Sequence, residues 1–199
     1  MSDGYLKDVY DLDGPGAVRS YYDKWARTYD AEVGENGYAT PARCAAALKA
    51  TGLPLTAPIL DMGCGTGLSG VALAAQGFAT LDGCDLSPEM LEQARAVGVY
   101  RDLFPADAVP PHPYAAIAAV GVIGPGAAPP DLFDTCLALL DPGGRLVFSF
   151  NDHALDIPDY PAKLQTARDS GAVRLLFEEH GDHLPGIGIK STVYVLEKT

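Results

Sequence analysis

Hydrophobic residues in the middle of the chain form short runs, separated by segments in which apolar positions recur with a helical period. The runs at 57–62, 79–85, 100–104, 114–120 and 144–150 predict strands that are buried in a sheet. Helices are predicted after the first two runs and between the last two. Strands and helices in this order are typical of a parallel sheet with helices on both faces.

Two further strands are predicted near the end of the chain, at 173–180 and 189–198. The connection at 181–188 is too short for a helix that crosses over the sheet, so these strands must pair antiparallel. The pattern therefore predicts an α/β fold with a mostly parallel sheet that ends in an antiparallel hairpin.

The N-terminal part of the chain has a helical segment rich in aromatic residues. A helix is predicted at 18–29, and spacings of three and four residues place Tyr22, Trp25 and Tyr29 largely on one face. Such a face is typical of a packed core, and it also suits a helix that covers a bound ligand. The residues alone leave both interpretations open.

A second helix is predicted at 41–50, with Thr40 as its N-cap and Gly52 at its end. We find no internal repeat, and 199 residues fit a single domain over residues 1–199. Within it, residues 1–52 contain the two N-terminal helices, and residues 53–199 contain the alternating strands and helices.

The composition is that of a folded domain with an acidic surface. Hydrophobic residues make up 48% of the chain and charged residues 20%, unlike the composition of disordered proteins. The 26 Asp and Glu outnumber the 14 Lys and Arg, so the formal charge is −12. This charge argues against nucleic acid and membrane surfaces as partners, because Lys and Arg supply most of the attraction to phosphates.

The cysteines and histidines do not form the pattern of a metal site, and we predict no bound metal. No C-x-x-C pair occurs, and the first residues lack the basic and apolar regions of an export signal. Free thiols and a cytoplasmic location are therefore expected, with disulfides as the alternative. His180 and His183 are predicted to be solvated hairpin residues rather than metal ligands.

The strongest local signal is a glycine-rich turn at 63–67 (GCGTG), directly after the first predicted strand. Such glycines let backbone N–H groups approach a ligand at the start of the next helix. The turn also contains the formal dinucleotide pattern at 65–70 (GTGLSG), and Asp85 lies where a ribose-binding acid belongs. A nicotinamide-dependent oxidoreductase is therefore one possible function.

Asp61 distinguishes between the possible ligands of this turn. It ends the first predicted strand, where a carboxylate would repel a pyrophosphate and attract a cation. A nucleoside that carries an ammonium group therefore fits the pattern better than a dinucleotide.

Residues 59–67 (ILDMGCGTG) and 84–91 (CDLSPEML) resemble the first two motifs of the Rossmann-like, class I S-adenosylmethionine-dependent methyltransferases. The segments 22–30, 100–103 and 140–146 extend this resemblance over most of the chain. Among subfamilies, the chain is most similar to the Williams–Beuren syndrome region methyltransferase-like proteins. The resemblance implies a Rossmann-like α/β fold with a seven-stranded, mostly parallel sheet whose last strand is antiparallel and with helices on both faces. It also implies that residues 1–52 form an N-terminal helical lid and residues 53–199 the cofactor-binding core. The implied cofactor is S-adenosyl-L-methionine, and the implied reaction is methyl transfer.

The resemblance also implies roles for individual residues. Asp61 would lie near the methionine ammonium, Asp85 would accept from both ribose hydroxyls, and Asp107 would accept from the adenine amino group. The implied cofactor contacts are Tyr22, Trp25, Tyr29, Asp61, Gly63, Cys64, Gly65, Gly67, Asp85, Leu86, Met90, Asp107, Ala108, Val120 and Gly121.

Methyl transfer depends mainly on alignment and exclusion of water, and a base is required only when the acceptor must lose a proton. Asp152 and His153, after the fifth predicted strand, are the candidates for such a base, with an ordinary loop pair as the alternative. Little chain lies outside the predicted core, which favours a small-molecule acceptor. A module that binds S-adenosylmethionine without turnover is the alternative function.

Overall fold

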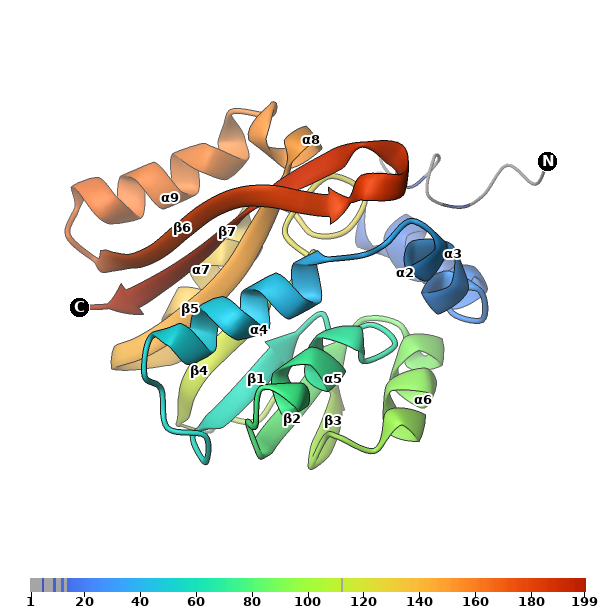
Figure 1. Cartoon of the computed structure of the whole chain (residues 1–199), viewed down its shortest axis with the longest axis horizontal. Helices are drawn as coiled ribbons and strands as arrows, with labels where there is room; N and C mark the ends of the chain where they lie inside the picture. The colour runs from blue at the N-terminus through green and yellow to red at the C-terminus, as the bar shows by residue number, and fades with distance from the viewer. Residues whose placement is uncertain (1–4, 6–8, 10–11, 13, 112) are drawn as a thin grey trace.

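A seven-stranded sheet, ordered β3-β2-β1-β4-β5-β7-β6, lies at the centre of the protein (Figure 1). The computed structural model describes Tyr5, Val9, Leu12 and residues 14–111 and 113–199. Strands β1 to β5 pair in parallel, and β7 pairs antiparallel with both β5 and β6. The predicted α/β sheet is therefore confirmed. Its strands are β1 Pro58–Met62, β2 Thr80–Asp85, β3 Asp102–Pro105, β4 Tyr114–Ala119, β5 Leu140–Asn151, β6 Val173–Leu184 and β7 Ile189–Lys198.

Helices cover both faces of this sheet. α4 and α5 contribute to the apolar cluster on one face, and α7 and α9 contribute to the cluster on the other. α2 and α3 lie to one side of the sheet (Figure 1). The described helices are α2 Pro15–Trp25, α3 Tyr29–Glu35, α4 Thr40–Ala50, α5 Leu68–Ala75, α6 Pro88–Val97, α7 Asp131–Ala138, α8 Asp152–Leu155, α9 Asp159–Asp169 and the 3-10 turn η2 Pro185–Ile187.

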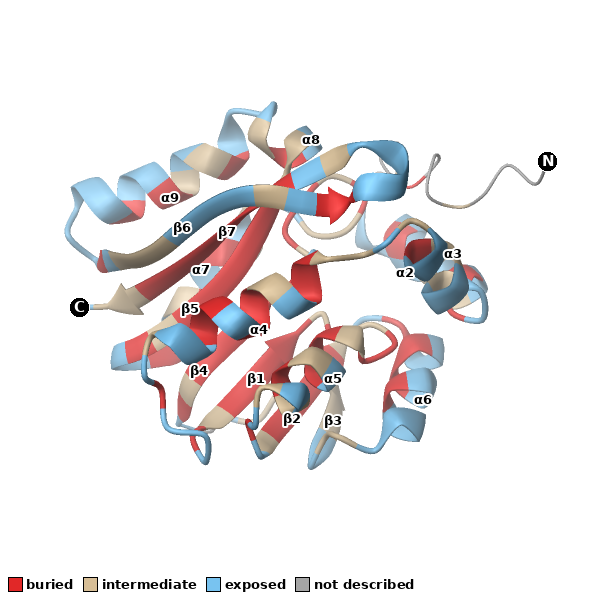
Figure 2. Cartoon of the chain, in the orientation of Figure 1, coloured by how far each residue is buried: buried red, intermediate tan, exposed pale blue. Residues whose placement is uncertain are grey.

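The core follows from the alternation of side chains along the strands. In β1, Ile59 belongs to the cluster with α4 and α5, whereas its neighbour Leu60 belongs to the cluster with α7 and α9. Val147 and Phe148 divide in the same way in β5. All four are completely buried, and Figure 2 shows the central strands largely buried, whereas β3 and much of β6 are not. Burial of each such side chain contributes about 1.5–3 kcal/mol, so both faces stabilise the sheet.

The helix predicted at 18–29 is in fact two helices. α2 ends at Trp25, where the Thr28 amide donates to the Trp25 carbonyl in a tight turn, and α3 begins at Tyr29. This turn brings the rings of Trp25 and Tyr29 within 4.7 Å, edge to face, so the bend itself packs the aromatic residues.

Three other predictions also require correction. α4 begins at Thr40, whose hydroxyl does not cap the helix because it bonds to residues of the terminal hairpin. β3 begins at Asp102 rather than Tyr100. The last hairpin continues to Leu184, because pairing with β7 extends past the predicted turn. His183 is therefore buried, with only 6% of its surface exposed, and is not a solvated residue.

α8 and α9 were not predicted from the sequence pattern. α9 buries Tyr160, Leu164 and Ala167 against the sheet and leaves most of its remaining surface exposed. None of the helices in the described part of the chain is long and apolar enough to cross a membrane.

Candidate functional site

A cavity of about 860 Å³ lies beside the carboxyl ends of β1, β2 and β4. Its walls come from the loops that follow β1, β2, β3 and β4, together with the N-terminal half of α2. Parallel α/β sheets bind their ligands at this end, where the connections to neighbouring strands diverge. The cavity therefore occupies the position expected of a binding site in this fold.

Two glycines allow the floor of the cavity to form. Gly63 has φ 71° and Gly121 has φ 66°, in the left-handed region that other residues rarely adopt. A Cβ atom at Gly63 would overlap the side chain of Val122, and one at Gly121 would overlap the hydroxyl of Tyr38. The glycine-rich loop therefore packs closely against the loop after β4 at Gly63, and that second loop packs closely against Tyr38 at Gly121.

Asp61 is completely buried beneath the glycine-rich loop. Its Oδ2 accepts hydrogen bonds from the hydroxyls of Ser69 and Tyr100, both at 2.6 Å. Its Oδ1 has no hydrogen-bond partner among the described residues. Burial raises the pKa of Asp61 to about 6, although the bonds from Ser69 and Tyr100 lower it. The loop therefore covers a carboxylate that lacks a partner for one oxygen.

The N-terminus of α5 is directed at the same carboxylate. Ser69, in the first turn of α5, donates to Asp61, and the Gly70 amide donates to the Tyr100 hydroxyl at 3.1 Å. A Cβ at Gly70 would overlap that hydroxyl, so the last glycine of the formal dinucleotide pattern makes room for Tyr100. The Gly70 amide, one of the helix-start donors that would face a pyrophosphate in a dinucleotide enzyme, is thus already used within the protein.

Asp85 lines the cavity at the end of β2. Its Oδ2 accepts from the Gly65 amide and its Oδ1 from the Ser87 amide, both at 2.9 Å. Burial raises the pKa of Asp85, whereas these backbone N–H groups lower it. Each carboxylate oxygen has one protein donor and keeps capacity for a second, so Asp85 is oriented to accept from a ligand in the cavity.

Two acids on the N-terminal helices connect them to the core. Asp23 of α2 accepts from the hydroxyl of Ser87, which also caps α6. Asp30 of α3 accepts from the hydroxyl of Thr66, in the glycine-rich loop. These bonds fasten α2 and α3 to the two loops that carry the predicted cofactor residues. Sequence reasoning missed both acids because nothing local distinguishes them from surface residues.

The cavity brings together most of the residues predicted to contact a cofactor. It does not include four of them. Trp25 is buried among the aromatic residues of α2 and α3, Asp61 lies under the loop, Gly67 packs against α6 and Tyr100, and Ala108 lies outside the lining. The predicted residues that line the cavity are Tyr22, Tyr29, Gly63, Cys64, Gly65, Asp85, Leu86, Met90, Asp107, Val120 and Gly121.

The two candidate bases lie elsewhere. Asp152 begins α8, and its carboxylate accepts from the Lys190 amide at 2.9 Å, which joins α8 to β7. Neither Asp152 nor His153 lines the main cavity. Tyr38, which was not predicted, lines it and also lines a second cavity of about 50 Å³ beside it.

Comparisons with known proteins agree with this geometry. A family model described as a methyltransferase domain matches residues 37–186. Human methyltransferase-like protein 27 is 46% identical over 85 residues, which cover 42% of this chain and 35% of that protein. A ubiquinone biosynthesis O-methyltransferase from Xylella fastidiosa (strain 9a5c) is 40% identical over 110 residues, or 49% of this chain and 43% of that protein. This chain therefore spans less than half the length of these curated relatives.

Among solved structures, magnesium protoporphyrin IX methyltransferase from Synechocystis PCC 6803, determined with bound SAM, has a TM-score of 0.71. It is 20% identical, and the match covers 94% of this chain and 98% of that one. The fold is therefore that of the Rossmann-like methyltransferases. With the family model matching most of the chain, the protein belongs to the methyltransferase domain family.

Proposed function

We propose that the main cavity binds S-adenosyl-L-methionine and that the protein transfers its methyl group to a small-molecule acceptor. The observation that carries this proposal is the position of Asp61 at the N-terminus of α5. A buried carboxylate with one free oxygen favours a cation above it and disfavours a pyrophosphate. S-adenosylmethionine carries both an ammonium and a sulfonium, whereas a nicotinamide dinucleotide carries a pyrophosphate.

The charges and shape of the cavity fit this cofactor. Asp85 would accept from both ribose hydroxyls, because each of its oxygens keeps capacity for a second donor. Leu86 and Met90 would pack on the adenine, and Asp107 would accept from its amino group. The close approach at Gly63 and Gly121 leaves backbone, rather than side chain, beneath the methionine portion.

S-adenosylmethionine, when bound, supplies a methyl group that is already activated by the sulfonium. The task of the protein is then to hold an acceptor in line with that group and to exclude water. α2 covers the cavity, and Asp23 and Asp30 hold α2 and α3 on the core. Much of the remaining lining is apolar, including Val122, Leu132 and Leu139, which suits an acceptor with an apolar body.

A small acceptor is favoured by both volume and charge. A cavity of about 860 Å³ is within the ~300–1,000 Å³ of small-molecule sites. The net charge of −12 opposes nucleic-acid acceptors, and the cysteines, all unpaired and buried, favour a reducing compartment such as the cytoplasm.

Calorimetry with S-adenosylhomocysteine and with NADH separates the proposed function from an oxidoreductase. We expect S-adenosylhomocysteine to bind and NADH to produce no heat of binding. Incubation with labelled S-adenosylmethionine and a small-molecule extract should then give a product 14 mass units heavier, which a binding module without turnover would not form. Absence of S-adenosylhomocysteine binding would overturn the proposal.

A further inference from the structure

The second cavity, of about 50 Å³, adjoins the main one, since Tyr29, Tyr38 and Gly121 line both. Trp25 and His183 also line it, and both are more than nine-tenths buried. The indole N–H of Trp25 has no hydrogen-bond partner among the described residues. A buried donor without an acceptor is costly, so this N–H indicates that something in the cavity accepts from it.

Asn151 lines the same cavity and carries a further donor group. Its Oδ1 accepts from the Ala154 amide at 2.9 Å, which caps α8. The amide oxygen is therefore used, and the NH₂ group is the free end of the side chain.

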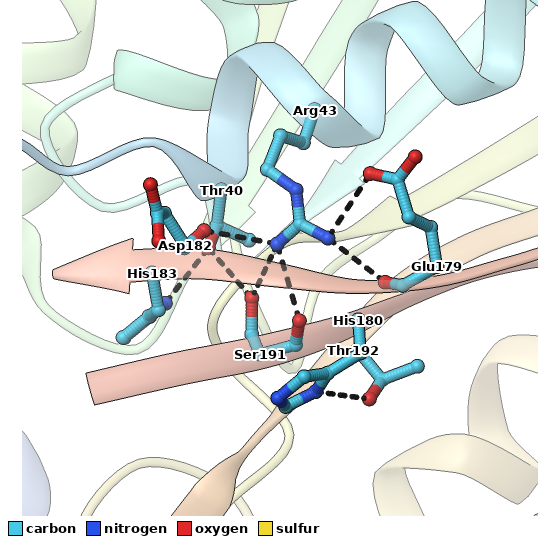
Figure 3. Close-up of polar contacts among 8 residues, drawn as sticks. All are labelled: Thr40, Arg43, Glu179, His180, Asp182, His183, Ser191 and Thr192. Atoms are coloured by element: carbon cyan, nitrogen blue, oxygen red, sulfur yellow. Dashed lines mark hydrogen bonds and ion pairs between the residues drawn. The ribbon is translucent and has the colours of Figure 1, made fainter. Parts of the chain in front are cut away.

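His183 supplies a further donor because of its connection to Arg43. Figure 3 shows Arg43 and Thr40 of α4 meeting the hairpin of β6 and β7. Arg43 Nη1 donates to Ser191 Oγ at 3.1 Å, Ser191 Oγ lies 3.0 Å from Thr40 Oγ1, and Thr40 Oγ1 lies 2.8 Å from His183 Nδ1. The guanidinium can only donate, which sets a direction at one end of this series.

The direction of these hydrogen bonds determines which ring nitrogen of His183 carries the proton. Both hydroxyl protons find acceptors only if Ser191 donates to Thr40 and Thr40 donates to Nδ1. The opposite tautomer would leave one buried hydroxyl proton without an acceptor among the described groups, which is unfavourable. Nδ1 is then an acceptor, and Nε2 carries the proton. Burial also lowers the pKa of His183 to about 4, so the ring is neutral at physiological pH.

We propose that the second cavity is a carboxylate-binding subsite, in which the Trp25 indole N–H and the Nε2–H of His183 donate to carboxylate oxygens. The cavity of about 50 Å³ has room for a group somewhat larger than a water molecule, which occupies about 30 Å³ in the liquid. The carboxylate belongs either to the amino-acid end of the cofactor or to the methyl acceptor. This inference rests on the proposed function and adds Trp25 and His183 to the residues of the binding site. Arg43 is a positioning residue, because it acts on His183 through Ser191 and Thr40.

Calorimetry on the full chain separates the two sources. His183→Met removes the donor, and His183→Gln, of nearly the same shape, keeps an N–H near the position of Nε2. If the carboxylate is that of the cofactor, His183→Met and Trp25→Phe weaken S-adenosylhomocysteine binding about tenfold. Binding of 5′-methylthioadenosine, which lacks the amino-acid end, is unchanged, and His183→Gln behaves like the wild type. Melting curves verify that each variant is folded.

If the carboxylate is that of the acceptor, all variants bind S-adenosylhomocysteine equally and the subsite stays open. Sodium acetate added to the S-adenosylhomocysteine-loaded protein then shifts the indole N–H resonance, which is unambiguous because the chain has one tryptophan. Sodium chloride at equal concentration is the control. Unchanged affinities together with no acetate shift overturn the subsite. Failure of the wild type to bind S-adenosylhomocysteine overturns the proposed function instead, and acetate then tests the subsite in the free protein.

The tautomer has its own measurement. Long-range ¹H–¹⁵N correlation spectra should show His183 protonated at Nε2 and unprotonated at Nδ1, and Thr40→Val or Arg43→Met should abolish this preference. A wild-type His183 protonated at Nδ1 would overturn the role of Arg43.

Discussion

The hydroxyl of Tyr100 donates to Asp61 at 2.6 Å and accepts from the Gly70 amide at 3.1 Å, so one phenol links the end of β1 to the start of α5. Tyr100 lies after α6, far from both partners in the sequence. Burial and the negative charge of Asp61 raise the pKa of Tyr100, so the hydroxyl keeps its proton and remains a donor.

Replacement of Tyr100 by Phe should show what this link contributes. The variant keeps the ring and removes the donor to Asp61, which leaves a buried carboxylate with only Ser69 as a side-chain donor. We expect a loss of about 1.5–3 kcal/mol in the free energy of unfolding, as for a hydrogen bond to a charged group. Urea denaturation measures this loss. Tyr5→Phe, which changes a tyrosine whose ring stacks on Trp25, is the control, and an equal loss in both variants would contradict a specific role.

The pKa of Asp61 predicts how cofactor binding depends on pH. With a pKa of about 6, Asp61 is mostly ionised at pH 7 and becomes neutral as the pH falls. Affinity for S-adenosylhomocysteine, whose ammonium keeps its charge, should therefore decrease below about pH 6, by up to about tenfold per unit. Calorimetry between pH 5 and 8 measures this decrease. In Asp61→Asn the affinity should no longer decrease near pH 6, whereas any decrease caused by protonation of Asp85 should remain.

The same pKa shift acts in the opposite direction on the stability of the free protein. Folding raises the pKa of Asp61 from 3.8, so the folded state binds more protons than the unfolded state between about pH 4 and 6. The contribution of Asp61 to the free energy of unfolding is therefore largest below this window and decreases as the pH rises through it. A profile of cofactor affinity that followed stability would contradict the proposed attraction between Asp61 and the ammonium.

Much of the sheet was predictable because its signals are local. Asp61 and Asp85 each end an apolar run and precede a turn or a helix start, and parallel strands bring such ends to one edge. Tyr100 has no comparable signal, since its partner Asp61 is 39 residues away and only the packed fold brings them together. Asp30 reaches Thr66 across 36 residues in the same way.

His183 illustrates a different limit of sequence reasoning. Its burial depends on how far β6 stays paired with β7, and a shift in register between Asp182 and Leu184 brings it under α4. A turn-rich segment does not show where pairing ends. The sequence likewise predicts a helix cap at Thr40, because nothing local shows that its hydroxyl bonds to His183, which lies 143 residues along the chain.

Asp85→Ala tests the proposed ribose contact. The variant removes an acceptor for two ribose hydroxyls, so S-adenosylhomocysteine affinity should decrease by about 1.5–3 kcal/mol, or roughly 10- to 150-fold. Glu92→Ala is the matched control, because Glu92 is an exposed acid on the neighbouring helix α6. Isothermal calorimetry measures both affinities. Equal affinity in Asp85→Ala and the wild type would mean that another residue binds the ribose.

The bonds of Asp23 and Asp30 predict that the lid controls how fast the cofactor leaves. Each acid accepts one hydroxyl proton from a loop that borders the cavity, and each bond contributes about 0.5–1.5 kcal/mol or somewhat more, because the acceptor is charged. The double variant Asp23→Ala/Asp30→Ala should therefore release S-adenosylhomocysteine about ten times faster or more. Stopped-flow fluorescence of the single tryptophan, Trp25 at the end of α2, measures the dissociation rate.

The control for the lid is Glu35→Ala, which removes an exposed acid of α3. S-adenosylhomocysteine should dissociate from this variant as fast as from the wild type, since the loss of one negative charge leaves the bonds of Asp23 and Asp30 in place. Single variants should each account for part of the increase, because the two bonds hold different helices to different loops. A double variant with the wild-type dissociation rate would mean that aromatic packing among Trp25, Tyr22 and Tyr29 alone holds the lid closed.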